Sequence, residues 1–188
     1  MRADKKNMPS ATATIERTHP VVPRDPAPEL EFELVGGGRW RLSDQRPRTF
    51  TMVLFYRGLH CPKCQAQLRE LDRRLDEFAE RGIEVVAVSG DSAERAHRTR
   101  DDWELERLRV GFGIEERTMR RWGLFVSGAI KDGEPARFNE PGLFLIDPDG
   151  TTFYAALTSA PWGRPPFDDI LGGIDYTVEN DAPARGEG

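Results

Sequence analysis

Apolar and polar residues alternate near the start of the chain in a way that predicts a β-hairpin. Leu30, Phe32 and Leu34 fall on one face of the first alternating stretch. The glycines at 36–38 favour a turn, and a second alternating stretch follows at 39–42. Two alternating runs joined by a glycine turn are typical of paired antiparallel strands.

Three runs are almost wholly apolar and rich in strand-forming residues. They span 49–56, 83–89 and 142–147. Such runs predict strands covered on both faces of a sheet. The Pro-Asp-Gly turn at 148–150 predicts that 151–157 returns as the hairpin partner of the last run.

Helical periodicity appears between these runs. Apolar or sulfur-containing residues recur in steps of three and four over 61–78, which predicts an amphipathic helix. Asp91 is expected to cap a charged surface helix. Two further helices are expected over 114–122 and 167–178, the second interrupted by the glycines at 172 and 173.

This order of elements predicts a single α/β sandwich. A right-handed crossover would place strands 49–56 and 83–89 side by side and parallel, with the last hairpin extending the sheet. The 188 residues favour one domain over two. We expect a disordered or loosely docked arm over 1–25, the domain over 26–178 and a flexible tail over 179–188.

The composition of the chain indicates what the protein binds and where it is located. The net charge is -5, which gives no general support for nucleic-acid binding. No apolar run is long enough to cross a membrane, and the mean hydropathy is -0.59. The first six residues are not followed by the apolar stretch of a secretory signal. We therefore expect a cytoplasmic protein that binds neither nucleic acid nor membranes.

The chain has two cysteines, Cys61 and Cys64, in a C-x-x-C arrangement. Pro62 suits the first position of a helix, which makes Cys61 the N-cap residue at the positive end of the helix dipole. Lys63 and Arg57 add cations nearby, so Cys61 is expected to be the attacking thiolate. Cys64 lies one turn further on and is placed to close a disulfide with it.

The segment 55–64 (Phe-Tyr-Arg-Gly-Leu-His-Cys-Pro-Lys-Cys), after a buried strand, resembles the active-site turn of the thioredoxin fold. Segments 26–34, 85–92 and 143–150 are similar to the hairpin, second strand and late strand of the peroxiredoxin-like (AhpC/TSA, redoxin) family. The resemblance covers about 26–178. It implies a thioredoxin-like three-layer sandwich with a mixed central sheet and an N-terminal β-hairpin.

The chain also departs from that family. Peroxiredoxins carry threonine, proline and arginine where this chain has Gly58, Leu54 and Pro141. A proline at the last place is a thioredoxin feature, and the resemblance implies a cis Glu140–Pro141 bond. The chain therefore resembles a peroxiredoxin body with thioredoxin-like details at the active site.

Two redox functions are compatible with these residues. In a peroxidase, Cys61 attacks a small hydroperoxide, and Cys64 condenses with the resulting sulfenic acid. Arg57 is then the available replacement for the missing donors. In a thioredoxin-like oxidoreductase, Cys61 attacks a protein disulfide and Pro141 offers an open backbone platform. Either function needs an external thiol reductant, no metal or organic cofactor is implied, and a homodimer is compatible with the sequence.

Other interpretations are weaker. A structural zinc site needs four ligands, and His60 with one distant histidine would have to join the two cysteines. His60 is more simply an exposed turn residue. If Cys61 were unreactive, the domain would instead be a non-catalytic binding module that docks a partner through the loop 158–167.

Overall fold

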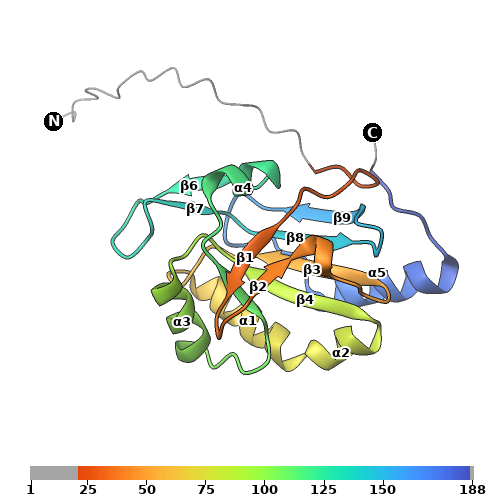
Figure 1. Cartoon of the computed structure of the whole chain (residues 1–188), viewed down its shortest axis with the longest axis horizontal. Coiled ribbons are helices and arrows are strands. Elements are labelled where there is room, and N and C mark those ends of the chain that lie inside the picture. The colour runs from red at the N-terminus through yellow and green to blue at the C-terminus, as the bar shows by residue number, and fades with distance from the viewer. Residues whose placement is uncertain (1–20, 187–188) are drawn as a thin grey trace, which may run out of the picture.

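The computed structural model describes residues 21–186, and a seven-stranded mixed sheet forms its centre (Figure 1). The strand order is β2-β1-β5-β4-β3-β8-β9, and β6 pairs with β7 outside this sheet. The strands are β1 (Glu31–Leu34), β2 (Arg39–Arg41), β3 (Phe50–Phe55), β4 (Ile83–Val88), β5 (Val110–Phe112), β6 (Val126–Gly128), β7 (Arg137–Asn139), β8 (Gly142–Ile146) and β9 (Thr152–Leu157). The helices are η1 (Leu42–Asp44), α1 (Pro62–Arg73), α2 (Leu75–Glu80), α3 (Ala93–Asp102), α4 (Glu116–Arg121) and α5 (Phe167–Asn180).

The predicted strand pairings are confirmed. β3 and β4 are parallel neighbours with Val53 opposite Val86, and β8 lies antiparallel on the other side of β3. The hairpins β1–β2 and β8–β9 also form as expected. Because β3 is central and buried along its whole length, the turn that follows it is held by a rigid strand.

The sheet is covered on both faces, which confirms the three-layer α/β sandwich. Leu68 of α1, Phe78 of α2 and Ile170 of α5 pack on one face. Trp122, directly after α4, and Trp40 of β2 belong to the core on the other face. Figure 1 shows this division, with α1, α2 and α5 on one side and α4 with the β6–β7 hairpin on the other.

Two helix predictions need correction. The helix expected over 61–78 is broken at Arg74 into α1 and α2. Leu71 and Phe78 remain in the core on either side of the break, so the apolar periodicity does not reveal it. The final helix is continuous through Gly172, where we expected an interruption. Its buried apolar side chains offset the cost of about 1 kcal/mol that a glycine imposes on a helix.

Two local details also differ from expectation. Ser92, and not Asp91, caps α3 by accepting the N–H of Arg95 at 3.4 Å. The Asp91 side chain points inward and accepts the Leu59 N–H in the turn before α1. The β6–β7 hairpin was not predicted, because its two strands of three residues each are too short for an alternating pattern.

The N-terminal end of the described chain packs on the domain. Val21 is buried, and the Arg24 N–H donates to the Thr152 carbonyl at 2.7 Å. Most of the predicted arm, residues 1–20, lies outside the described residues. Within 21–186, no helix has both the length and the apolar character needed to span a membrane.

Candidate active site

The turn between β3 and α1 presents Cys61 at a helix N-terminus. Cys61 is the N-cap residue and Pro62 occupies the first helical position. The Cys61 sulfur accepts the N–H of Cys64 at 3.3 Å. This local geometry follows from the sequence, because an N-cap acceptor satisfies an N–H that has no partner within the helix.

A buried carboxylate from the loop between β4 and α3 supports the same turn. Asp91, whose side chain is fully buried, accepts the Leu59 N–H at 2.7 Å and an Arg95 hydrogen bond at 2.7 Å. Gly58 has a φ of +121°, and a Cβ there would lie 2.7 Å from the Asp91 carboxylate. The threonine that peroxiredoxins carry at this place would therefore collide with Asp91 in this turn.

The most unexpected member of the site is Arg164, from the loop between β9 and α5. Its Nη2 donates to the Cys64 sulfur at 3.2 Å and lies 3.7 Å from the Cys61 sulfur. Its Nη1 donates to the Gln67 side-chain oxygen at 2.6 Å. Arg164 lies 100 residues from Cys64 in the chain, so no local pattern could reveal this contact. The signal available was the proline-rich loop 158–167, to which sequence reasoning gave only a docking role.

The two sulfurs differ sharply in acidity. Cys64, through its thiol and its N–H, lowers the pKa of Cys61, and the Arg57 and Arg164 guanidiniums lower it further, to about 5 despite burial. Burial raises the pKa of the Cys64 thiol well above its usual range, and its hydrogen bond with Cys61 adds to this rise. Cys61 is therefore the thiolate and Cys64 the thiol in the reduced protein at neutral pH.

Arg57 occupies the other side of the cysteine pair. Its Nε lies 3.0 Å from Glu140 Oε2, and its guanidinium stacks over the Phe138 ring at 4.8 Å. Its backbone N–H donates to the Cys64 sulfur at 3.4 Å. Glu140 also accepts the Ser127 hydroxyl at 2.6 Å. Arg57, predicted as a supporting cation, is thus held by a buried ion pair and an aromatic ring.

The structure corrects the expectation for Pro141. The Glu140–Pro141 peptide is trans, as are the other peptide bonds of residues 21–186. The Glu140 N–H donates to the Phe125 carbonyl at 2.8 Å, and the Pro141 carbonyl accepts the Thr158 N–H at 3.1 Å. These bonds hold the segment extended on both sides of the trans peptide. Pro141 is buried, so it offers no open backbone platform.

His60 and Lys63 have different environments. His60 is mostly buried rather than exposed, and its ring lies 4.6 Å from the Phe138 ring. Burial, helped by the charge of Arg57, lowers the pKa of His60 to about 4. Lys63 lies exposed on the first turn of α1, and its effect on Cys61 stays a prediction. No cluster of three or more metal-ligating side chains occurs within residues 21–186.

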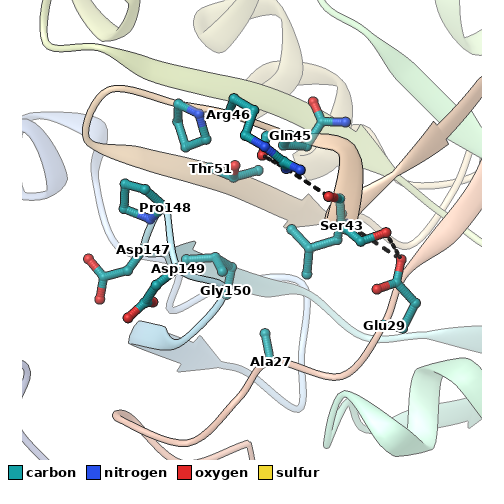
Figure 2. Close-up of a pocket in the computed structure, with 13 residues that line it drawn as sticks. Ala27, Glu29, Ser43, Gln45, Arg46, Thr51, Asp147, Pro148, Asp149 and Gly150 are labelled. Atoms are coloured by element: carbon teal, nitrogen blue, oxygen red, sulfur yellow. Dashed lines mark hydrogen bonds between the residues drawn. The ribbon is translucent and has the colours of Figure 1, made fainter.

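A separate cavity of about 340 Å³ lies at the opposite end of β3 (Figure 2). Arg46 folds back onto the Ser43 carbonyl at 2.7 Å, and Asp147 and Asp149 lie across the cavity. The Asp149 carboxylate accepts the hydroxyl of Thr151 at 2.7 Å. This cavity contains carboxylates and one arginine but no sulfur nucleophile.

A family model extends across most of the chain. The model described as the AhpC/TSA family matches residues 23–155. The chain belongs to the AhpC/TSA family. It is therefore an oxidoreductase with a thiol-dependent redox role, as the cysteine pair indicates. A search of curated proteins found no match.

The solved structures with a similar fold include peroxiredoxins of low sequence identity. Peroxidoxin BcpB from Mycobacterium tuberculosis is 17% identical with a TM-score of 0.67, over 84% of this chain and 98% of that one. A peroxiredoxin-like protein from Aquifex aeolicus is 17% identical with a TM-score of 0.69, over 85% and 90%. The reduced 2-Cys peroxiredoxin of Plasmodium vivax is 20% identical with a TM-score of 0.67, over 85% and 98%. These similarities establish the thioredoxin-like fold.

Proposed function

We propose that this protein is a thiol peroxidase that reduces small hydroperoxides at Cys61. Cys64 then forms a disulfide with Cys61, and an external thiol restores the dithiol. The observation that carries this proposal is the enclosure of the Cys61 sulfur. The residue is only 1% exposed and lies beside the guanidiniums of Arg57 and Arg164.

Enclosure of this kind favours a small oxidant. Hydrogen peroxide or the end of a hydroperoxide can enter a narrow site, whereas a protein disulfide must meet an exposed sulfur. The loop 158–167 also covers Pro141 and bonds to its carbonyl through Thr158. The backbone surface on which a thioredoxin-like enzyme would dock a substrate is therefore occupied, which argues against protein disulfide exchange.

The peroxidase step follows from the charges at the site. The Cys61 thiolate attacks the nearer peroxide oxygen, the O–O bond breaks, and Cys61 becomes a sulfenic acid. The departing oxygen leaves as water or an alcohol after taking a proton. Guanidinium donors stabilise negative charge on that oxygen. Arg57 and Arg164 take over the role for which the family uses a threonine and an arginine.

The proposal is tested by rapid mixing of the fully reduced protein with hydrogen peroxide under pseudo-first-order conditions. Trapping of Cys61 sulfenic acid, followed by mass spectrometry, gives the second-order rate constant. We expect oxidation far faster than that of a free thiol with the same pKa. A rate constant equal to that of the free thiol would overturn the peroxidase assignment.

Two features of the wider setting are part of this proposal. A cytoplasmic location is consistent with a thiol that must be returned to the reduced state. The Cys64 sulfur is fully buried, so the external reductant must either be small or act after the loop 158–167 moves. The external thiol reductant and a homodimeric state remain predictions.

A further inference from the structure

Cys64 must become a thiolate before it can attack Cys61 sulfenic acid, yet its sulfur is enclosed. Cys64 is 0% exposed, and burial raises the pKa of its thiol well above the usual range. A buried anion needs a cation or several donors to compensate for lost hydration. The resolving step is therefore favoured by a positive group, or by several donors, in contact with the Cys64 sulfur.

Arg57 is poorly suited to that task. Its guanidinium is committed to Glu140, from which its Nε is 3.0 Å away, and it stacks on Phe138. Only its backbone N–H reaches the Cys64 sulfur, at 3.4 Å. A paired guanidinium contributes less net positive charge to a neighbouring sulfur than an unpaired one.

Arg164 has the position and the charge that the step needs. Its Nη2 is closer to the Cys64 sulfur, at 3.2 Å, than to the Cys61 sulfur, at 3.7 Å. Gln67 holds it through a neutral amide oxygen at 2.6 Å, and no acidic side chain of residues 21–186 pairs with it. Its buried Nε has no hydrogen-bond acceptor within the same residues, which leaves one donor unused.

We infer that Arg164 is a catalytic residue of the resolving step, in which it stabilises Cys64 as the attacking thiolate. This inference rests on the proposed peroxidase function. In the reduced protein the guanidinium faces a charged Cys61 sulfur and a neutral Cys64 thiol. Oxidation converts Cys61 into an uncharged sulfenic acid, and the positive charge of Arg164 then acts on Cys64 alone.

The step balances without any further reactant. Cys64 releases its proton to water, and its sulfur attacks the Cys61 sulfur. The S–S bond forms as the S–O bond of the sulfenic acid breaks, and the departing hydroxide takes a proton to become water. The electron pair of the Cys64 thiolate becomes the S–S bond, so the Cys64 sulfur is oxidised and the Cys61 sulfur is reduced, both to the disulfide level.

The test measures the oxidation of Cys61 and the formation of the disulfide separately within one turnover. Reduced wild-type protein and the variants Arg164→Gln and Gln67→Glu are mixed with one equivalent of hydrogen peroxide and quenched at intervals. Gln67→Glu nearly preserves side-chain shape but places a carboxylate against Arg164, so it tests charge without removing the contact. Arg73→Gln is the control, since it removes an exposed cation of α1 that lies outside the site. Mass spectrometry counts sulfenic acid and disulfide.

We expect both site variants to form the disulfide roughly 10- to 100-fold more slowly than wild type, the range expected for a hydrogen bond to a charged group. The pH at which the resolving rate reaches half its maximum should rise, because Cys64 then ionises less readily. Arg164→Lys should restore part of the rate. Unchanged resolving rates and an unchanged pH profile in both variants would overturn the inference.

A peroxide-free version keeps this result separate from the peroxidase proposal. Cys61 is first converted to its methyl mixed disulfide with methyl methanethiosulfonate, and release of methanethiol by Cys64 is followed. We expect faster release in wild type and Arg73→Gln than in Arg164→Gln and Gln67→Glu. That order of rates would support the role of Arg164 even if peroxide proved a poor substrate. Equal release rates in all four proteins would contradict it.

Discussion

The two ends of β3 carry very different sites. At its start lies an open cavity of about 340 Å³, where Arg46 satisfies backbone carbonyls and Asp149 caps a turn (Figure 2). At its end, the two cysteine sulfurs are buried. A cavity of only about 10 Å³ lies beside Pro141 and Arg164, and a second cavity of about 320 Å³ opens along Lys63, Gln67 and Arg164. Empty volume alone therefore does not locate the chemistry of this protein. The chemistry lies where the ionised Cys61 sulfur is close to two guanidiniums.

The largest expected effect tests whether all of the chemistry lies at the cysteine end. Cys61→Ser should abolish peroxide turnover, because the attacking thiolate is gone. Cys64→Ser should keep the first oxidation and then stall as a sulfenic acid or a mixed disulfide. Steady-state turnover with a thiol reductant, together with intact-protein mass spectrometry, reads both outcomes. Full turnover in Cys61→Ser would refute the assignment of the site.

Removal of the Arg57 charge should have the next largest effect. Arg57→Gln should slow Cys61 oxidation on the order of 10²-fold, the cost of losing one preorganised donor. The pH midpoint of Cys61 alkylation should rise from about 5, because a neighbouring cation no longer favours the thiolate. Iodoacetamide kinetics between pH 4 and 9 measure this shift, and an unchanged midpoint would contradict the role of Arg57.

A second variant separates the effect of Arg57 on the oxidation rate from its effect on folding stability. Arg57→Gln leaves Glu140 as a buried carboxylate without its cation, which costs about 3–5 kcal/mol in comparable pairs. The double variant Arg57→Gln/Glu140→Gln removes both charges and should recover much of that stability. Its oxidation rate should stay low. Recovery of the rate along with the stability would mean that Arg57 acts only on the fold.

The packing of the turn can be tested with two glycines. Gly58→Ala combines a positive φ with a Cβ 2.7 Å from the Asp91 carboxylate, whereas Gly37→Ala has a positive φ and open space. We expect Gly37→Ala to cost about 1–2 kcal/mol and Gly58→Ala about 1–3 kcal/mol more. Urea denaturation measures both free energies of unfolding. Equal costs would show that Asp91 does not constrain the turn.

A smaller effect is expected from His60 on the pH dependence of folding stability. Its folded pKa of about 4 lies below the 6.5 of an unfolded histidine, so the unfolded state binds more protons between these values. The stability that neutral His60 supports is complete above pH 6.5 and is lost as pH falls towards 4. His60→Phe should flatten this part of the stability curve in thermal denaturation. A slope identical to that of wild type would exclude His60, and His97→Gln, an exposed site, serves as the control.

The smallest effect is expected at the opposite end of the sheet. Arg46→Gln should change the free energy of unfolding by less than about 0.5 kcal/mol, as for other surface substitutions. The rate of Cys61 oxidation should equal that of wild type. A clear loss of peroxidase rate would mean that the cavity in Figure 2 communicates with the cysteine site.

Sequence reasoning succeeded where the causes are local. A cysteine followed by proline, in the turn after a buried strand, specifies an N-cap sulfur. The strand pairing follows from apolar runs and turn residues. It failed for Arg164, whose contact depends on the path of a loop 100 residues away. The sequence predicts Asp91 as the N-cap of α3, but its carboxylate accepts the Leu59 N–H of the turn before α1, a contact that the local pattern does not reveal. The trans Glu140–Pro141 bond is the isomer that most X–Pro bonds adopt, and the cis expectation came from the family resemblance alone.

The central claim is that the enclosed Cys61 reacts with peroxide in preference to disulfides, and a competition experiment tests it most directly. Reduced Cys64→Ser protein is offered equal concentrations of hydrogen peroxide and a peptide disulfide, with dimedone present to trap sulfenic acid. Mass spectrometry then counts the two adducts on Cys61. We predict that the dimedone adduct dominates, because Cys61 is 1% exposed beneath Arg164 and the Pro141 surface is covered. Dominance of the peptide mixed disulfide would contradict the account.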